Sequence, residues 1–313
     1  MVAGDIQNLF DHWDAETIKV SAPLEIIFVC GGTTDPAVPH DLSRRDALLS
    51  VSMLGDLAKY RFIRAEDVNV LAPRGHYKEF LTFELDIGQL SQIVLLFCES
   101  SGSFVELGAF IMEGEIAHRM LVVIDDTKHD DDSFIRWGAL QYLEEHYSRS
   151  AICVLKTQEI GQGAGARPDD IDKTAFATVI ASALKARVRA AREHQNFDPS
   201  KSGHMIKLIT GLIQDYGALK GDEIESVMAH IGHPLKEGDF LRYTQCAEAL
   251  GWIKKDQRNL EDYFTATSQK EAIRFTFSGK PIDRQRWRAD VLQYWKREDP
   301  DRFESIQVNR PRR

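Results

Sequence analysis

Residues 98–110 read Cys-Glu-Ser-Ser-Gly-Ser-Phe-Val-Glu-Leu-Gly-Ala-Phe, and the hydrophobic period changes abruptly where this stretch begins. The apolar run before it, Ile93 to Phe97, is typical of a strand buried on both faces. From Ser103 the apolar residues fall at helical spacing, which predicts a helix at the carboxyl end of a central strand, with Ser101 or Ser103 as its cap. Such a junction presents free N–H groups and the positive end of a helix dipole, which suit phosphates and ribose hydroxyls.

Glu106 in this predicted helix has two interpretations. It lies three residues after Ser103, the spacing of a capping-box acid with a structural role. It also lies in the first turn, where it would face the crevice above the sheet. A carboxylate there could attack the anomeric carbon of a sugar or stabilise positive charge on it, as in glycosyl transfer. The spacing alone leaves both interpretations open.

The composition bounds the class of protein. At 313 residues the chain is long enough for two domains, and its net charge of −9 argues against a general nucleic-acid binder. The cysteines are isolated, which predicts buried reduced thiols with neither a disulfide frame nor a metal site. We find no signal-peptide pattern and no apolar run of membrane-spanning length, so we expect a cytoplasmic protein that does not enter the membrane.

Strand and helix patterns alternate over residues 23–156. The predicted strands are Leu24–Cys30, Asp67–Ala72, Ile93–Phe97, Met120–Ile124 and Ala151–Leu155. Predicted helices between them are Ser43–Tyr60, Phe80–Leu90, the Glu106 helix and Phe134–Tyr147. This order predicts a doubly wound, mostly parallel five-stranded sheet. Its ligand edge would carry the residues that follow the strands, namely Gly31, Pro73, Cys98 and Asp125.

Three further features of this edge are candidate site elements. The pair Gly31-Gly32 would let a ligand approach the backbone closely, although a tight turn is the alternative and the dinucleotide fingerprint is incomplete. Glu84, near the start of its helix, would hold ribose hydroxyls or activate water, with a solvated acidic turn as the alternative. Asp125 at the end of the fourth strand could do the same.

The remaining segments have other patterns. Residues 1–22 predict a short N-terminal helical extension, and residues 157–203 predict a linker that includes the long helix Ile171–His194. Residues 204–313 predict three helices and two strands around a polar turn, followed by a C-terminal helix. That order resembles a winged helix-turn-helix, which binds either nucleic acid or protein.

Six residues of the last segment are candidates for nucleic-acid or partner binding. The third predicted helix would present Arg242, Tyr243 and Gln245. The C-terminal helix carries Arg284, Arg286 and Arg288 beside two tryptophans, which combines charge with stacking surface. A solvated basic face with inward-packed tryptophans is the alternative for that helix.

The chain resembles a known family, the effector proteins of bacterial retrons that pair a nucleoside deoxyribosyltransferase-like domain with a winged-helix domain. The resemblance is carried by Ile27-Phe-Val-Cys-Gly-Gly32, by residues 94–110, and by Ser133-Phe-Ile-Arg-Trp-Gly138 after Asp125. It covers roughly residues 24–155, and beyond them the likeness is one of layout. Ala72-Pro-Arg-Gly-His76 stands where the family has an acidic turn, so substrate contacts from that loop are not carried over.

The resemblance implies an N-glycosidase that hydrolyses NAD+ to nicotinamide and ADP-ribose in anti-phage defence, with NAD+ as substrate and no cofactor. It implies that Glu106 is the nucleophilic or charge-stabilising carboxylate. The ribose and phosphates would be lined by Cys30, Gly31, Gly32, Ser101, Gly102 and Ser103. It also implies restraint by a reverse transcriptase with its msDNA, and leaves open a homo-oligomer or filament.

Two other classes of function stay open. The first is a deoxyribosyltransferase or glycosidase that acts on free nucleosides or nucleotides. The second is a non-enzymatic winged-helix regulator that binds nucleic acid.

Overall fold

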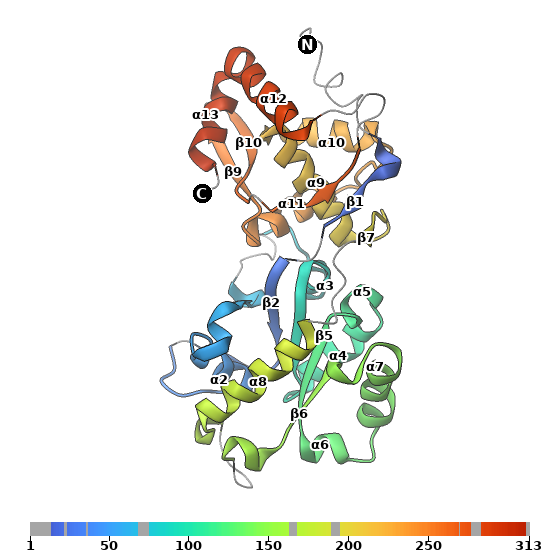
Figure 1. The fold of residues 1–313 in the computed structure, drawn as a ribbon, viewed down its shortest axis with the longest axis vertical. Coiled ribbons are helices and arrows are strands. Elements are labelled where there is room, and N and C mark those ends of the chain that lie inside the picture. The colour runs from blue at the N-terminus through green and yellow to red at the C-terminus, as the bar shows by residue number, and fades with distance from the viewer. Residues whose placement is uncertain are drawn as a thin grey trace. The chain divides into compact units, whose positions relative to one another are not determined.

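The computed structural model describes residues 14–21, 24–35, 37–67, 75–162, 168–188, 195–268, 270–276 and 283–310. These residues form two compact units (Figure 1). The α/β unit contains the described residues between 24 and 67 and between 80 and 188. The C-terminal unit contains residues 14–21, residues 75–79 and the described residues from 195 onward.

The α/β unit is built on a five-stranded sheet whose neighbouring strands all run parallel. The strands are β2 (Leu24–Cys30), β3 (Arg61–Ile63), β4 (Ser91–Phe97), β5 (Met120–Asp125) and β6 (Ile152–Leu155). Their order is β3-β2-β4-β5-β6. The middle strands β4 and β5 are almost wholly apolar because both faces of the sheet are covered. The structure thus confirms the predicted α/β class and its parallel sheet.

Helices cover both faces of the sheet (Figure 1). α2 (Arg44–Val51) and α8 (Lys173–Val188) share one hydrophobic core with β2, β4 and β5. α3 (Phe80–Leu90) and α4 (Ser101–Ile111) pack against β4 on the opposite face. The shorter helices are α5 (Gly114–Ala117), α6 (Asp126–Asp130), a π-helix at Ile135–Leu140 and α7 (Gln141–His146). Short 3-10 helices lie at Gly55–Lys59, Ala65–Asp67, Arg149–Ala151, Thr157–Ile160 and Pro168–Asp170.

The strand order reverses direction at β2 and β4, because β3 lies beyond β2 whereas β5 and β6 lie beyond β4. In open parallel sheets, ligands bind outside the carboxyl ends of the strands at such a reversal. The segments that leave these two ends are Gly31-Gly32 and Cys98–Ser100. The fold therefore locates the candidate site at this edge, where α2 and α4 begin.

A strand that the sequence patterns did not predict follows β2 in the described residues. β3 is Arg61–Ile63 and pairs with β2, whereas Asp67 lies in a 3-10 helix and residues 68–74 are outside the described part. A strand of three residues is too short to show a period, which is why the pattern missed it. The predicted position of Pro73 also lies outside the described residues.

Two predicted helices are interrupted. The helix expected over 43–60 ends at Val51, and Gly55 adopts a positive φ of 50° that starts a separate 3-10 helix. The helix expected over 134–147 is a π-helix followed by α7. Both segments have continuous helical spacing of apolar residues, so the spacing did not show the breaks.

The long helix expected in a linker belongs to the α/β unit. Phe176, Ile180 and Leu184 of α8 are fully buried in the core that α8 shares with the sheet. Their spacing of four residues places them on one face, and burying that face stabilises the helix against β4 and β5. The α/β unit thus extends to the last described residue of α8, Val188.

In the described part of the C-terminal unit, residues 202–266 form three helices and a three-stranded antiparallel sheet. The elements follow the order α9 (Ser202–Tyr216), β8 (Ala218–Leu219), α10 (Gly221–His230), α11 (Asp239–Ala249), β9 (Ile253–Arg258) and β10 (Glu261–Ala266). The strands pair as β8-β10-β9. Two helices follow, α12 (Arg284–Glu298) and α13 (Pro300–Asn309).

A second sheet of this unit joins three distant segments, in the order β11-β1-β7. Its strands are β1 (Lys19–Val20), β7 (Gln195–Asn196) and β11 (Ile273–Arg274). The described part of the predicted N-terminal extension is thus a 3-10 helix, Ala15–Thr17, and the middle strand of this sheet. In neither unit does a helix among the described residues have the length and apolar character needed to cross a membrane.

Candidate functional site

Helix α4 begins at Ser101 and is capped by Ser100, not by Ser101 or Ser103 as predicted. The Ser103 amide donates to Ser100 Oγ at 3.2 Å, and the Ser100 amide donates to Ser103 Oγ at 3.0 Å. This reciprocal capping box fully occupies the buried Ser103 hydroxyl. Glu106 is therefore not the capping acid, and its structural interpretation is wrong.

Glu106 is half-buried and has an oxygen without compensation. Its Oε2 is buried and finds no hydrogen-bond partner among the described residues. Burial raises the pKa of this carboxyl, opposed by the positive charge of Arg45 and reinforced by the negative charge of Glu66. An acidic group held in this way is typical of a functional site rather than of a structural ion pair.

Glu84 and Cys30 are electrostatically coupled to Glu106. Burial raises the pKa of Glu84 to about 8, and the negative charges of Glu106 and Glu66 add to the rise. The pKa of the Cys30 thiol is raised by burial and then by Glu84 and Glu106. The electrostatic influence of Glu84 of α3 and Glu106 of α4 on each other and on Cys30 places both carboxyls near the carboxyl end of β2. Cys30 stays a protonated, buried thiol there.

Arg45 is a cation at this edge that the sequence patterns did not single out. Its guanidinium is buried and bonds both oxygens of Glu66, at 2.8 and 2.7 Å, and the Gly32 carbonyl at 3.2 Å. Burial works to raise the pKa of Glu66, but the hydrogen bond and charge of Arg45 win and lower it. We name Glu66, Glu84 and Glu106 the carboxylate cluster. Only Glu66 of the three is paired with Arg45 by a hydrogen bond in the described residues.

A side chain of the protein itself, Glu99, occupies the space beside Gly32 and accepts a hydrogen bond from its amide. Glu99 accepts from the amides of Gly32 at 3.2 Å, Arg44 at 2.8 Å and Arg45 at 3.1 Å, so it occupies the start of α2. A Cβ on Gly32 would lie 2.6 Å from the Glu99 carboxylate. Gly32 is therefore needed for this close packing, and its amide does not point at an empty ligand site. The position of Glu99, two residues after a buried strand, was the sequence signal that could have predicted this contact.

Gly31 is also needed for packing. Its φ is +136°, and a Cβ there would lie 2.8 Å from Phe97. By contrast, Ser101 and Gly102 at the start of α4 are exposed, and a Cβ on Gly102 would meet nothing closer than 3.8 Å. Among the residues predicted to line the ribose and phosphates, Ser101 and Gly102 are therefore the two that are exposed and could contact a ligand.

Asp125 is engaged as a helix cap. It accepts from the Lys128 amide at 2.9 Å, from Thr127 Oγ1 at 2.6 Å and from Arg44 Nη1 at 3.1 Å. Burial acts to raise the pKa of Asp125, but these hydrogen bonds and the charge of Arg44 lower it. Asp125 therefore remains ionised and bonded within the protein, unlike Glu84.

The predicted binding residues of α11 are partly used in packing. Tyr243 is buried, and the Arg242 guanidinium lies over its ring at 4.7 Å and pairs with Asp239 at 3.4 Å. Gln245 Oε1 accepts from the His76 amide at 2.6 Å. These contacts hold α11 within the C-terminal unit. Arg242 is half-buried and charged, so it is the predicted residue of α11 best suited to contact nucleic acid.

Two of the three arginines of α12 form an internal ion-pair network. Arg284 and Arg288 both bond the fully buried Asp215 of α9, whereas Arg286 is exposed. Trp287 and Trp295 are buried. The alternative of inward-packed tryptophans is therefore confirmed, and Arg286 is the exposed cation of the three.

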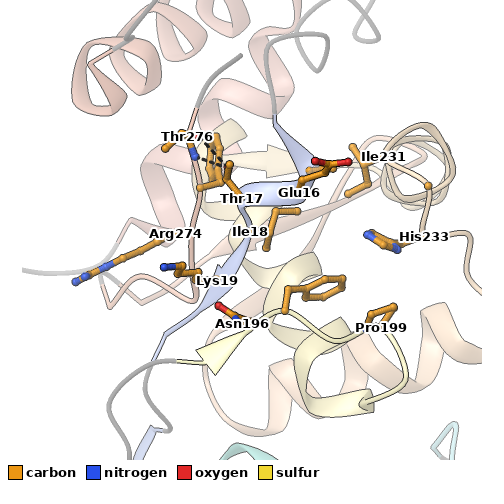
Figure 2. A pocket seen from close by; sticks show the side chains of 14 residues that line it. Glu16, Thr17, Ile18, Lys19, Asn196, Pro199, Ile231, His233, Arg274 and Thr276 are labelled. Atoms are coloured by element: carbon orange, nitrogen blue, oxygen red, sulfur yellow. Dashed lines mark hydrogen bonds between the residues drawn. The ribbon is translucent and has the colours of Figure 1, made fainter. Parts of the chain in front are cut away.

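The C-terminal unit holds a cavity of about 890 Å³ beside its β11-β1-β7 sheet (Figure 2). Ile18, Ile231 and Pro199 supply its apolar lining, and the rings of Phe197 and His233 lie 4.9 Å apart. Burial lowers the pKa of His233. None of the residues predicted for catalysis or binding lines this cavity.

Comparison with known proteins defines the class. Residues 41–255 match the family described as STM3845 retron effector protein, a span that includes the carboxylate cluster, α9–α11 and the start of β9. The chain belongs to this retron effector family. It is 30% identical over 152 residues to an Escherichia coli protein named "Retron Ec86 putative ribosyltransferase/DNA-binding protein". The match covers 47% of this chain and 46% of the relative, so the chain spans about half the length of the curated relative it matches.

Proposed function

We propose that this retron effector is an N-glycosidase that hydrolyses NAD+ at the bond between nicotinamide and ribose. The observation that carries the proposal is the half-buried Glu106 carboxylate, whose Oε2 lacks a hydrogen-bond partner in the described residues, at the strand-order reversal of a parallel sheet. A ribosyltransferase name for the Escherichia coli relative supports chemistry at a sugar. It does not distinguish NAD+ from other nucleotides.

The proposed chemistry needs one ionised carboxylate. Nicotinamide in NAD+ is a cationic leaving group, so the C1′–N bond breaks with its electron pair moving to the nicotinamide nitrogen, without a proton donor. Glu106 would stabilise the resulting oxocarbenium charge or attack C1′. Water then adds to C1′ and loses one proton, which yields ADP-ribose.

Glu84 would have a complementary role. With a pKa of about 8 it is protonated at neutral pH, so it adds no second negative charge beside Glu106. Its carboxylic acid would donate a hydrogen bond to a ribose hydroxyl, while the exposed start of α4 at Ser101 and Gly102 would face the phosphates.

The direct test incubates the purified chain with NAD+ and separates the products. We expect nicotinamide and ADP-ribose from the wild type and from Glu113→Gln, a control at an exposed acid just beyond α4. From Glu106→Gln we expect both products to form about 10³-fold more slowly. Equal nicotinamide release by Glu106→Gln would contradict the assignment. Release of a free base from nucleosides, with NAD+ untouched, would instead establish the nucleoside or nucleotide glycosidase alternative.

We also propose that α9–β8–α10–α11–β9–β10 is a winged helix. The order of helix, short strand, two helices and two antiparallel strands is the observation that supports it. The relative's name includes DNA binding, which favours a role for this unit in contact with the reverse transcriptase and msDNA of the retron. Release from that complex would then activate the enzyme. Measured affinity of the chain for msDNA with and without Arg242→Ala tests the contribution of α11.

A further inference from the structure

The α/β unit exposes large apolar side chains on α4 and at the neighbouring π-helix. Val105 of α4 and Met112, which caps the carboxyl end of α4, are 73% and 79% exposed, and Phe134 and Trp137 are 88% and 58% exposed. α4 packs beside the π-helix, so these side chains belong to adjoining elements. We name them the α4 apolar face. Exposed apolar side chains on adjoining elements are typical of interaction surfaces.

The exposed stripe of α4 is uncharged. Ser101, Val105, Gly108 and Met112 recur at helical spacing, and a Cβ on Gly108 would meet nothing within 4 Å. Exposed helix faces in water normally carry charged residues, which are depleted at the centre of protein interfaces. The open space above Gly108 would let another protein approach the helix backbone closely.

The aromatic residues of this face are held in place. Trp137 Nε1 donates to Asp132 Oδ1 at 2.6 Å, and the Arg136 guanidinium lies 5.1 Å from the Trp137 ring centre. The Phe134 ring lies against Gly138, where a Cβ would come within 3.0 Å of it. Aromatic anchors that are ordered before binding lose less conformational entropy when a partner docks.

The charges that border the face favour one kind of partner. Exposed acids precede Phe134 and follow Met112; they are Asp130, Asp131, Asp132 and Glu113. The neighbouring cations are engaged within the protein, because Arg136 pairs with Glu144 at 3.3 Å and Lys128 lies 4.0 Å from Asp125. The exposed acids would therefore repel a nucleic-acid backbone, and a second copy of the chain would bring the same acids. A protein surface with apolar pockets and a lysine- or arginine-rich border is complementary to it.

We propose that the α4 apolar face docks a basic protein surface, and that within the proposed function this protein is the reverse transcriptase of the same retron. This inference rests on the proposed function for the identity of the partner. α4 also carries Glu106, one residue after Val105 and about 100° around the helix. A protein seated on the face would therefore lie beside the proposed catalytic carboxylate and could restrain access to it.

The test measures binding of the purified chain to the purified reverse transcriptase complex by interferometry. The double variant Phe134→Ala/Met112→Ala removes the two most exposed apolar side chains of the face, and we expect its affinity to fall about ten-fold or more. The matched control is Met53→Ala/Leu54→Ala, which truncates two exposed apolar residues elsewhere in the α/β unit and should bind like the wild type. Asp130→Lys/Asp131→Lys should slow association.

Four results would overturn the docking surface. The first is unchanged affinity of the double variant, and the second is no binding by the wild type. The third is light scattering that shows a homodimer which the double variant separates, because a second copy would then occupy the face. The fourth is loss of binding when the nucleic acid of the complex is digested away. NAD+ cleavage by the same preparations is measured separately, so failure of the glycosidase proposal remains distinguishable from failure of docking.

Discussion

Two carboxylates withdrawn from solvent, Asp215 in α9 and Glu106 in α4, have opposite surroundings. Asp215 accepts from Arg284 at 2.8 and 2.9 Å and from Arg288 at 2.7 Å. Glu106 has a buried oxygen with no such partner in the part of the chain that the structure describes. A buried charge held by two guanidinium groups ties helices together, whereas an uncompensated one is costly to keep and is available to a ligand.

The largest expected effect of this difference is on activity. Glu106→Gln removes the proposed nucleophile or charge stabiliser, so we expect NAD+ cleavage to fall about 10³-fold. The free energy of unfolding should stay level or rise slightly, because a poorly solvated charge is removed. Product analysis and urea unfolding check the two expectations. A strongly destabilised Glu106→Gln would show that Glu106, like Asp215, is a structural tie.

Asp215→Asn should have the second-largest effect, and it concerns stability. The change leaves Arg284 and Arg288 without the carboxylate that holds them against α9, which should cost about 3 kcal/mol of unfolding free energy. Asp290→Asn on the exposed side of α12 is the control and should change little. Chemical denaturation followed by tryptophan fluorescence measures both, and equal stability of the two variants would contradict the comparison.

Glu99 is an intermediate case that sharpens the contrast. It is bonded like Asp215, but to backbone amides at the start of α2 and not to cations. Glu99→Ala leaves those amides without an acceptor, so we expect a loss of about 2 kcal/mol in unfolding free energy. Thermal unfolding measures the loss. A gain in stability would show that placing the Glu99 carboxylate at the start of α2 costs more free energy than its hydrogen bonds contribute. These amides would then bind a different anion more favourably.

The smallest effect is the pH dependence of Glu84. Its pKa is raised from 4.5 to about 8, so the folded chain binds this proton more tightly than the unfolded chain. The group therefore stabilises the fold relative to its ionised state below pH 4.5, and that stability is lost as the pH rises from 4.5 through about 8. A shift of this size corresponds to a loss of roughly 3 kcal/mol between pH 6 and 9 for a fully buried group. Glu84 is half-buried, so screening by solvent reduces the expected loss to roughly 1 kcal/mol, which Glu84→Gln should remove.

Thermal unfolding of the wild type and of Glu84→Gln at several pH values tests that window. Glu113→Gln, the same change at an exposed position, is the control. Parallel slopes in all three proteins would mean that Glu84 ionises normally and is not coupled to Glu106.

Much of the α/β unit follows from local pattern. The boundaries of β2 and α3 match the predicted strand Leu24–Cys30 and helix Phe80–Leu90, because long apolar runs and helical periodicity act within one segment. Glu106 was also singled out from its place after a buried strand. β3 escaped prediction because three residues carry no period, and the cap moved to Ser100 because several adjacent serines compete for it.

The surroundings of the charges could not be predicted, because they depend on contacts distant in sequence. Glu99 reaches the start of α2, and Arg284 and Arg288 reach Asp215 some 70 positions earlier in the chain. A sequence shows that these residues are charged but not which charge each one meets. Arg284 and Arg288 were therefore predicted to bind a partner and are found inside an ion-pair network.

The strand order of the β11-β1-β7 sheet limits where the chain can be truncated. β1, at residues 19–20, is the middle strand between β11 and β7, although both of those partners come from beyond residue 194. A fragment that starts at residue 195 would keep the two outer strands and lose the one that joins them. Adding residues 14–21 as a separate peptide should therefore restore such a fragment, in the manner of a split-protein complementation assay.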